Sequence, residues 1–197
     1  AAVPTLRYLL GAGASVTACT HLGRPKGEPD PAYSVAPVRA KLAEWLPEVT
    51  LLDNLRFGPG ETANDPAFVQ ALIEGHDAYV NDAFGASHRA HASIVGPPHF
   101  LPSAAGRLLH REVEVLGGMN DRPRRPFVAV MGGSKVSDKL AVIEALLEHV
   151  DSLIVGGGMC FTFLKAKGHN IGSSLCENDM VGTCKAILGG PKTIHLP

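Results

Sequence analysis

Short apolar runs alternate with amphipathic segments along most of the chain, and this alternation limits the possible folds more than any other feature. We predict strands at the apolar runs, residues 16–19, 49–52, 78–80, 127–131, 153–155 and 193–196. The segments between them predict helices near residues 4–10, 35–46, 66–74, 104–116, 136–149, 159–167 and 179–188. Strands that alternate with helices form parallel sheets covered by helices. The predicted fold class is therefore α/β.

Two local patterns support these helices. Asp65 precedes Pro66, and a capping side chain before a proline whose φ is already helical is typical of a helix start. The helix predicted at 136–149 has an apolar stripe made of Leu140, Ile143, Leu146, Leu147 and Val150. Because such a helix buries its stripe, we expect Glu144 and Glu148 on the opposite flank to contact water.

The helical pattern is interrupted at residues 120–126, which contain two prolines and three arginines. Proline clusters of this kind mark turns and linkers, so we predict an interdomain hinge here. The hinge would separate a first lobe at residues 1–120, including a linking helix near 104–116, from a second lobe at 126–197. The second lobe is short for an independent domain, so we expect only its beginning to be present.

Composition argues against several classes of protein. A net charge of −1 and an isoelectric point near 6.8 argue against general nucleic-acid binding, and no run of about eighteen apolar residues could cross a membrane. The four cysteines show no C-x-x-C spacing, which fits a reducing compartment, so we expect a cytoplasmic protein. No secretory signal is visible, but the first residue already lies in a helical pattern, so we expect the natural N-terminus to lie upstream.

Residues 127–139 have the pattern of a buried strand, a glycine turn and a helix start. The apolar run is followed by Gly132-Gly-Ser-Lys135. Glycines let a ligand approach the backbone, and the N–H groups of a first helical turn favour negative charge. If the helix begins near Ser134, Lys135 and Lys139 share one face near its positive end, where a polyphosphate would relieve their repulsion. The alternative is a tight strand–helix connection with two solvated lysines.

Basic residues follow each of the first three predicted strands. They are His21 and Arg24 after the first strand, Arg56 after the second, and His88, Arg89 and His91 after the third. Ligands of open parallel sheets bind beyond the carboxyl ends of the strands, so these side chains could converge into one cationic pocket. Because the arginine fork suits carboxylates and phosphates, the expected ligand is a small, multiply charged anion. A solvated side chain or an internal ion pair is simpler for any one residue, but the repeated placement favours a site.

Three other patterns have competing interpretations. His88 and His91 could chelate zinc from one helix, but no acidic or cysteine partner has metal-site spacing, so we predict no metal there. Gly11-Ala-Gly13 ends a helix and precedes a strand, the reverse of the dinucleotide-binding order, so we predict a helix C-cap. Gly156-Gly-Gly158 follows a strand and precedes a helix. This turn could admit a nucleotide, or it could allow a helix to pack closely on a strand.

Five motifs together resemble the phosphoglycerate kinase family. They are His21-Leu-Gly-Arg-Pro-Lys-Gly27, Leu52-Asp-Asn-Leu-Arg-Phe57, Tyr79-Val-Asn-Asp-Ala-Phe-Gly85 running into His88-Arg-Ala-His-Ala-Ser93, Gly132-Gly-Ser-Lys-Val-Ser-Asp-Lys139, and Gly156-Gly-Gly-Met159 running into Phe161-Thr-Phe-Leu164. They occur in the family's order and cover nearly the whole chain. The resemblance implies a monomeric glycolytic kinase with two Rossmann-like lobes joined by a helix and hinge. The first lobe would bind 3-phosphoglycerate or 1,3-bisphosphoglycerate, the second would bind ADP or ATP with Mg²⁺, and closure would bring the lobes together.

The resemblance also implies roles for individual residues. The phosphoglycerate ligands would be His21, Leu22, Gly23, Arg24, Arg56 and Arg89. The nucleotide ligands would be Gly133, Ser134, Lys135, Lys139, Gly156, Gly157 and Gly158. Lys135 and Arg24 would be the catalytic residues, with Lys135 meeting the transferring phosphoryl group. The attacking group of the family's reaction is an ionised carboxylate, which explains the absence of a general base: alignment and charge neutralisation suffice.

The chain departs from the family pattern by omissions. An opening strand with Arg-Val-Asp-Phe-Asn is missing before Ala1, a strand and a helix are missing between Leu46 and Leu51, and the remainder of the second lobe is missing after Pro197. The last omission includes the acidic groups near the magnesium nucleotide, so we assign no metal ligand in this chain. We expect a polypeptide of only these residues to be inactive or poorly folded. The alternative function is a non-catalytic anion- or nucleotide-binding module of the same fold.

Overall fold

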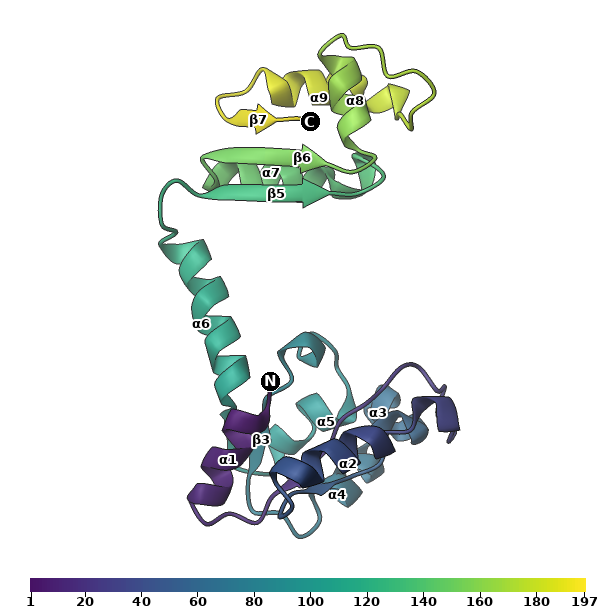
Figure 1. The fold of residues 1–197 in the computed structure, drawn as a ribbon, viewed down its shortest axis with the longest axis vertical. Helices are drawn as coiled ribbons and strands as arrows, with labels where there is room; N and C mark the ends of the chain where they lie inside the picture. Colours follow the sequence, from purple (N-terminus) through teal and green to yellow (C-terminus); the bar gives the residue numbers. More distant parts are fainter. The chain divides into compact units, whose positions relative to one another are not determined.

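The computed structural model describes residues 1–197, and its backbone divides into two compact units, Ala1–Leu116 and Gly117–Pro197. Helix α6 (Arg107–Asp121) belongs to both units, because its first turns lie in the first unit and its last residues in the second (Figure 1). Each unit is described below by itself.

The first unit contains two separate pairs of parallel strands. Strand β1 (Thr17–Ala18) pairs with β2 (Thr50–Leu51), and β3 (Tyr79–Asn81) pairs with β4 (Ser103–Ala105). The helices of this unit are α1 (Val3–Gly11), α2 (Ala36–Trp45), α3 (Pro59–Ala63), α4 (Pro66–Ile73), α5 (Ala92–Val95) and the start of α6. Four 3₁₀ helices join them, η1 (Pro31–Tyr33), η2 (Leu55–Phe57), η3 (Phe84–Ala86) and η4 (Pro97–His99).

The carboxyl end of β3 holds the start of helix α6. Asp82 follows β3, and its Oδ1 accepts hydrogen bonds from the backbone N–H groups of Leu108 and Leu109, at 2.8 and 3.1 Å. A Cβ at Gly106 would lie 2.2 Å from Oδ1 of Asp82, so only glycine allows the capping carboxylate to come this close.

The second unit is built on a three-stranded parallel sheet. Its strand order is β5 (Val128–Gly132), β6 (Ser152–Gly156) and β7 (Thr193–His195), and Gly132 pairs with Gly156 at the carboxyl ends. The helices are α7 (Leu140–His149), α8 (Cys160–Ala166) and α9 (Val181–Leu188), with the 3₁₀ helices η5 (Ser137–Lys139) and η6 (Asn178–Met180). Figure 1 shows α7 behind β5 and β6.

The core of the second unit lies between this sheet and its helices. Ile143 of α7, Leu153 of β6 and Phe163 of α8 are fully buried in one apolar cluster with Met131 and Val155. The other face of the sheet is open, because the side chains of Val130 and Ile154 are 77% and 39% exposed. In the first unit, a smaller cluster of Val16, Leu46 and Val49 packs against leucines of α1.

The predicted α/β class is confirmed, and so are the local signals. Oδ1 of Asp65 accepts the backbone N–H of Phe68 at 2.8 Å, which caps α4. Ile143 and Val150 are buried, whereas Glu144 and Glu148 are exposed. Helix α1 ends at Gly11, and Gly13 has a φ of +85°, as expected for a helix C-cap and turn.

Several predicted boundaries are wrong. Residues 104 and 105, predicted to begin a helix, belong to strand β4, and the helix runs from Arg107 to Asp121 rather than ending at residue 116. The segment 136–149 becomes regular α-helix only at Leu140, after the 3₁₀ turn η5. Helices α3 and α5 are absent from the sequence-based prediction.

No helix is long and apolar enough to span a membrane. All four cysteines, Cys19, Cys160, Cys176 and Cys184, have free thiols.

Candidate anion-binding sites

The loop after β1 is fixed onto the segment after β2 in the first unit. Nδ2 of Asn54 donates to the carbonyl oxygens of Leu22 and Tyr33, at 2.8 and 2.9 Å. Gly23 has a φ of +62°, and a Cβ there would lie 2.2 Å from the ring of Tyr33, so the turn requires glycine. These contacts hold the backbone of the loop that carries Arg24 against η2, and the side chain of Arg24 is exposed.

Arg56 is the most confined of the predicted ligands. It is 9% exposed, and Nη1 donates to the carbonyl oxygen of Gly23 at 2.7 Å. Nε of Arg56 is buried and has no hydrogen-bond partner. Buried polar groups nearly always have partners, so an unpaired guanidinium donor is unusual, and an anion would reach it only after the atoms that cover it move.

The pKa values of the surrounding groups indicate that positive charges gather here. Burial, followed by the positive charge of Arg89, lowers the pKa of Arg56, against an opposing effect of Glu61 and with a smaller lowering by Arg24. Burial and the charge of Arg56 also lower the pKa of His21. The pKa of His91 falls by burial and by the charges of Arg56 and Arg89, against an opposing effect of Glu61. The basic residues predicted to converge therefore lie within electrostatic range of one another.

The segment after β3 carries the remaining basic residues in an irregular loop. His88 and Arg89 follow η3, and His91 immediately precedes α5, so the two histidines do not lie on one helix. His88 is exposed, and Arg89 and His91 are half-buried. No cluster of three or more His, Cys, Asp or Glu side chains in the chain has the geometry to hold a metal ion.

Glu61 is a residue of this region that sequence reasoning missed. It lies on α3, is 1% exposed, and both of its carboxylate oxygens accept hydrogen bonds from Ser93. Nδ1 of His91 lies 3.7 Å from Oε1 of Glu61. A buried carboxylate is expected to have hydrogen-bond donors as partners, but the sequence around Glu61 does not show which residues these are.

The glycine turns of the second unit pack against each other. The backbone N–H of Met159 donates to the carbonyl oxygen of Gly133 at 2.9 Å. A Cβ at Gly157, whose φ is +67°, would lie 2.9 Å from that same carbonyl oxygen. A Cβ at Gly158 would lie 3.4 Å from the backbone of Ser134. Close backbone packing therefore explains why Gly157 is glycine without any ligand.

The predicted anion site at a helix N-terminus needs a correction. Glu177 accepts hydrogen bonds from the backbone N–H groups of Val136 and Ser137, at 2.5 and 3.2 Å, and from Oγ of Ser137 at 2.5 Å. These N–H groups are therefore not free for a phosphate. Lys135 also lies before η5 rather than inside the helix, so it shares no helical face with Lys139. Both lysines are exposed, and neither has a salt-bridge partner.

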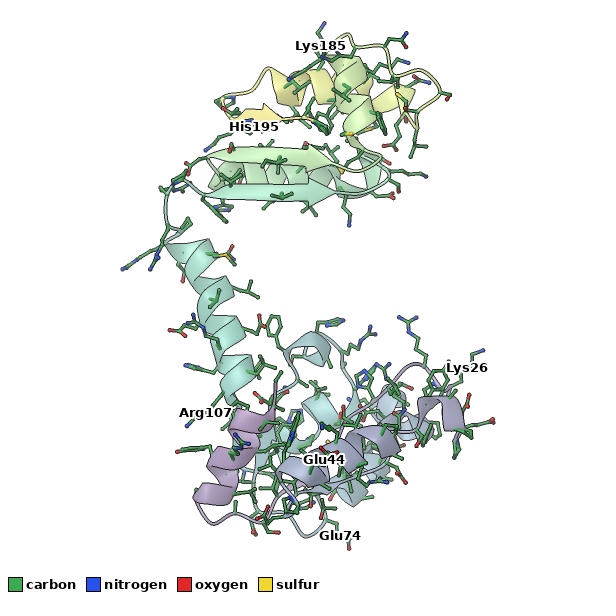
Figure 2. All side chains as sticks on the ribbon, viewed as in Figure 1. Lys26, Glu44, Glu74, Arg107, Lys185 and His195 are labelled. Carbon is green, nitrogen blue, oxygen red and sulfur yellow. The ribbon has the colours of Figure 1, made fainter.

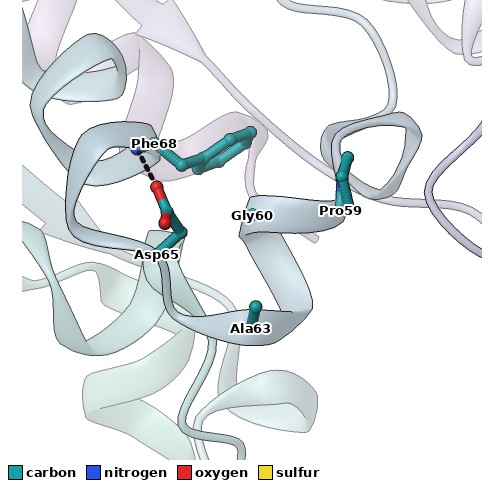
Figure 3. A pocket seen from close by; sticks show the side chains of 5 residues that line it. All are labelled: Pro59, Gly60, Ala63, Asp65 and Phe68. Carbon is teal, nitrogen blue, oxygen red and sulfur yellow. Dashed lines mark hydrogen bonds between the residues drawn. The ribbon is translucent and has the colours of Figure 1, made fainter.

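A separate hollow lies between α3 and α4, and none of the predicted ligands lines it. It is lined by Pro59, Gly60, Ala63, Asp65 and Phe68, and the carboxylate of Asp65 is used to cap α4 (Figure 3). Because this lining has no basic side chain, the hollow is not a candidate anion site.

Comparison with known proteins identifies relatives over the whole chain. Residues 1–51 and 46–197 match the family model described as phosphoglycerate kinase. The chain is 55% identical over 216 residues to a phosphoglycerate kinase of Salinispora arenicola, which covers 95% of this chain and 54% of that protein. It is 50% identical over 230 residues to the phosphoglycerate kinase of Frankia alni, and this alignment covers 100% of this chain and 58% of that protein. The structure matches that of phosphoglycerate kinase from Coxiella burnetii with a TM-score of 0.86 and 38% sequence identity. The match covers 100% of this chain and 56% of that chain.

The chain spans about half the length of the curated relatives that it matches. The two family matches overlap at residues 46–51, the stretch where we predict the chain to be shorter than the family. The alignment with the Frankia alni protein extends over 230 positions, more than the 197 residues of this chain, so that relative has residues without counterparts here.

Proposed function

The chain belongs to the phosphoglycerate kinase family, and we propose that the protein transfers a phosphoryl group between 1,3-bisphosphoglycerate and ADP, giving 3-phosphoglycerate and ATP. The observation that supports this most directly is the guanidinium of Arg56, which is fixed by Gly23 beside the loop that carries His21 and Arg24 and lies within electrostatic range of Arg24 and Arg89. A site of this kind suits an anion with both a carboxylate and a phosphate group.

The reaction needs charge and alignment rather than a base. In the direction of ATP consumption, a carboxylate oxygen of 3-phosphoglycerate forms a bond to the γ-phosphorus, while the bond from that phosphorus to the oxygen of ADP breaks. The carboxylate is already ionised, so no proton has to be removed. We assign binding of 3-phosphoglycerate to His21, Leu22, Gly23, Arg24, Arg56 and Arg89. Arg24 would neutralise charge close to the reacting carboxylate.

We assign the nucleotide to the second unit. Lys135 and Lys139 would contact its phosphates as mobile point charges, and Lys135 would meet the transferring group. Gly133, Ser134 and the turn from Gly156 to Gly158 would lie against the nucleotide. Because Glu177 occupies the N–H groups of Val136 and Ser137, phosphate binding in this proposal depends on lysine side chains rather than on a helix N-terminus.

The nucleotide would be bound with Mg²⁺, which neutralises phosphate charge in reactions of this class. Mg²⁺ bound with a nucleotide is usually held by one or two carboxylates together with the phosphates, and we assign no residue of this chain to the metal.

We further propose that the protein is a cytoplasmic monomer, and that residues 120–126 act as a hinge between a lobe at residues 1–120 and a lobe at 126–197. The two prolines in this stretch support the hinge. The four free thiols support a reducing compartment.

A coupled assay on the intact protein, in which the product of ATP and 3-phosphoglycerate is consumed by an added dehydrogenase, tests the proposal. We expect 3-phosphoglycerate-dependent turnover that Lys135→Ala abolishes and Arg24→Ala reduces by weakening 3-phosphoglycerate binding. Binding of both ligands without turnover would instead support the alternative, a non-catalytic module of the same fold. Lys185→Ala is a matched control, because Lys185 is an exposed lysine of α9 in the same unit (Figure 2).

A further inference from the structure

Glu61 connects two segments of the first unit through Ser93. Its Oε2 accepts the backbone N–H of Ser93 at 2.9 Å, and its Oε1 accepts Oγ of Ser93 at 2.6 Å. Glu61 lies on α3 and Ser93 on α5, and both residues are buried. One carboxylate therefore joins α3 to α5 by two hydrogen bonds.

These two segments carry the arginines of the proposed site. Glu61 lies just after Arg56 on the stretch of η2 and α3, and Ser93 lies just after Arg89 on the loop that enters α5. A change in the distance between Glu61 and Ser93 would therefore change the relative positions of Arg56 and Arg89.

Ser93 is also held from a third side. Its carbonyl oxygen accepts a hydrogen bond from Oη of Tyr79 on β3 at 2.6 Å. All three polar groups of Ser93, its N–H, hydroxyl and carbonyl, are thus used to hold α5 to α3 and to β3. Glu61 supplies two of the three contacts. No sequence motif identified Glu61, and none of the predicted roles requires it.

We propose that Glu61 is a positioning residue of the anion site, which sets the spacing between the Arg56 and Arg89 segments by holding Ser93. The identity of the ligand, 3-phosphoglycerate, rests on the proposed function. Glu61 touches no ligand in this proposal and acts through the two arginines.

The electrostatic effect of Glu61 on a bound anion has the opposite sign. A buried negative charge close to a cationic site repels an anion, so neutralising it would strengthen binding if its field were its main influence. The positioning role predicts weaker binding instead. The direction of the change therefore separates the two effects.

Glu61→Gln makes this comparison with little change of shape. The amide oxygen can accept the backbone N–H of Ser93 while the amide NH₂ donates to its Oγ, but the hydroxyl hydrogen of Ser93 then loses its acceptor, and the remaining hydrogen bonds lose the charge of the carboxylate. Ser93→Ala removes only the hydroxyl and keeps the charge of Glu61. Glu74→Gln is the matched control, because Glu74 is an exposed glutamate at the end of α4 in the same unit (Figure 2).

Calorimetric titration of the intact protein with 3-phosphoglycerate and, separately, with ADP tests the proposal. We expect Glu61→Gln to raise the dissociation constant for 3-phosphoglycerate about tenfold, because this is the usual cost of an unpaired buried polar group. The dissociation constant for ADP should not change. Ser93→Ala should weaken 3-phosphoglycerate binding less, and the effects of Glu61→Gln and Ser93→Ala should not add, because both break the same link. Thermal unfolding of each variant shows whether it folds.

Unchanged or tighter binding by folded Glu61→Gln would overturn the proposal, and so would equal losses for 3-phosphoglycerate and ADP. If the unsubstituted protein does not bind 3-phosphoglycerate, the proposed function fails, and the same variants are titrated with inorganic phosphate. Weaker phosphate binding by Glu61→Gln would then support the role of Glu61 in an anion site of another specificity. Absence of phosphate binding as well would refute both proposals.

Discussion

At the scale of single residues, Arg56 has the environment that most strongly favours anion binding. Its guanidinium is buried, one nitrogen is bound by the carbonyl of Gly23, and Nε has no partner. A lysine at this position would keep the charge, but its ammonium group is a compact point charge without the planar fork that lets arginine donate to Gly23 and to an anion in fixed directions.

We therefore expect Arg56→Lys to raise the dissociation constant for 3-phosphoglycerate about tenfold or more, which corresponds to the loss of one charge-assisted hydrogen bond. Arg7→Lys, an exchange at an exposed arginine of α1, should leave it unchanged. Calorimetry on the two variants measures the difference. Equal affinities of Arg56→Lys and the unsubstituted protein would show that Arg56 is only a structural residue.

His21 and His91 make stability depend on pH. The pKa of each lies below the ordinary histidine value of 6.5 in the folded state, chiefly because burial disfavours the charged form. The unfolded chain therefore binds more protons than the folded chain just below pH 6.5, so the free energy of unfolding should fall as the pH drops through this window and be fully present above it.

Urea unfolding at pH 7.5 and pH 5.5 measures this fall. Replacing both His21 and His91 with Gln should make it smaller, whereas replacing the exposed His88 with Gln should not. An equally steep fall in the double variant would assign the pH dependence to other groups.

The predicted and the missed residues differ in how much tertiary information they require. His21, Arg24, Arg56 and Arg89 follow strands, and the topology of a parallel sheet places such positions at one edge. Glu61 and Glu177 act through partners 32 and 40 residues away in the chain, Ser93 and Ser137. Nothing in the local sequence of either glutamate indicates that partner.

At the scale of elements, the start of α7 depends on Glu177. Hydrogen bonds from Ser137 and Val136 outweigh the effect of desolvation and hold the pKa of this carboxyl below its ordinary value of 4.5. A depressed pKa means that the contribution to stability is present above pH 4.5 and is lost as the pH falls through the folded-state pKa.

Glu177→Gln should therefore lower the melting temperature at pH 7, because the amide has one acceptor oxygen where the carboxylate has two. The difference between the two proteins should shrink at pH 3, where the carboxyl of the unsubstituted protein becomes protonated. Thermal unfolding at both pH values measures it, with Glu148→Gln on the exposed flank of α7 as the control. A difference that does not depend on pH would exclude the charge of Glu177 as its cause.

The packing of α7 on the sheet depends on its apolar stripe. Ile143 is completely buried in the core cluster, whereas the neighbouring Val142 is 49% exposed. Ile143→Ala should lower the free energy of unfolding by about 2–5 kcal/mol through lost burial and a residual cavity, and Val142→Ala should change it by less than about 1 kcal/mol. Urea denaturation of both variants tests this. Similar costs for the two would contradict the assigned face of the helix.

Long elements with a clear pattern were predictable, and short ones were not. The stripe of α7 and the cap of α4 identified those helices. Strand β4 has the sequence Ser-Ala-Ala, which lacks the β-branched and aromatic residues typical of strands, and it forms because β3 provides a parallel partner. Helices α3 and α5 have only five and four residues, too few for a recognisable period.

At the scale of the whole molecule, the family is established by the comparisons, whereas the reaction remains a proposal, because the chain spans about half the length of its relatives. The sequence predicted the family from five motifs, because they occur in the family's order and cover nearly the whole chain. It could not predict that Glu177 would take the helix N–H groups first assigned to a phosphate, because that contact forms between segments distant in the chain.

The central claim is that a carboxylate receives the phosphoryl group, and identification of the product tests it most directly. The intact protein is incubated with magnesium ATP, 3-phosphoglycerate and hydroxylamine, which converts an acyl phosphate into a hydroxamate but leaves a phosphate ester unchanged. We predict a hydroxamate that requires both substrates and is absent from Lys135→Ala. ADP formed with inorganic phosphate alone, or with a stable phosphate ester, would contradict transfer to a carboxylate.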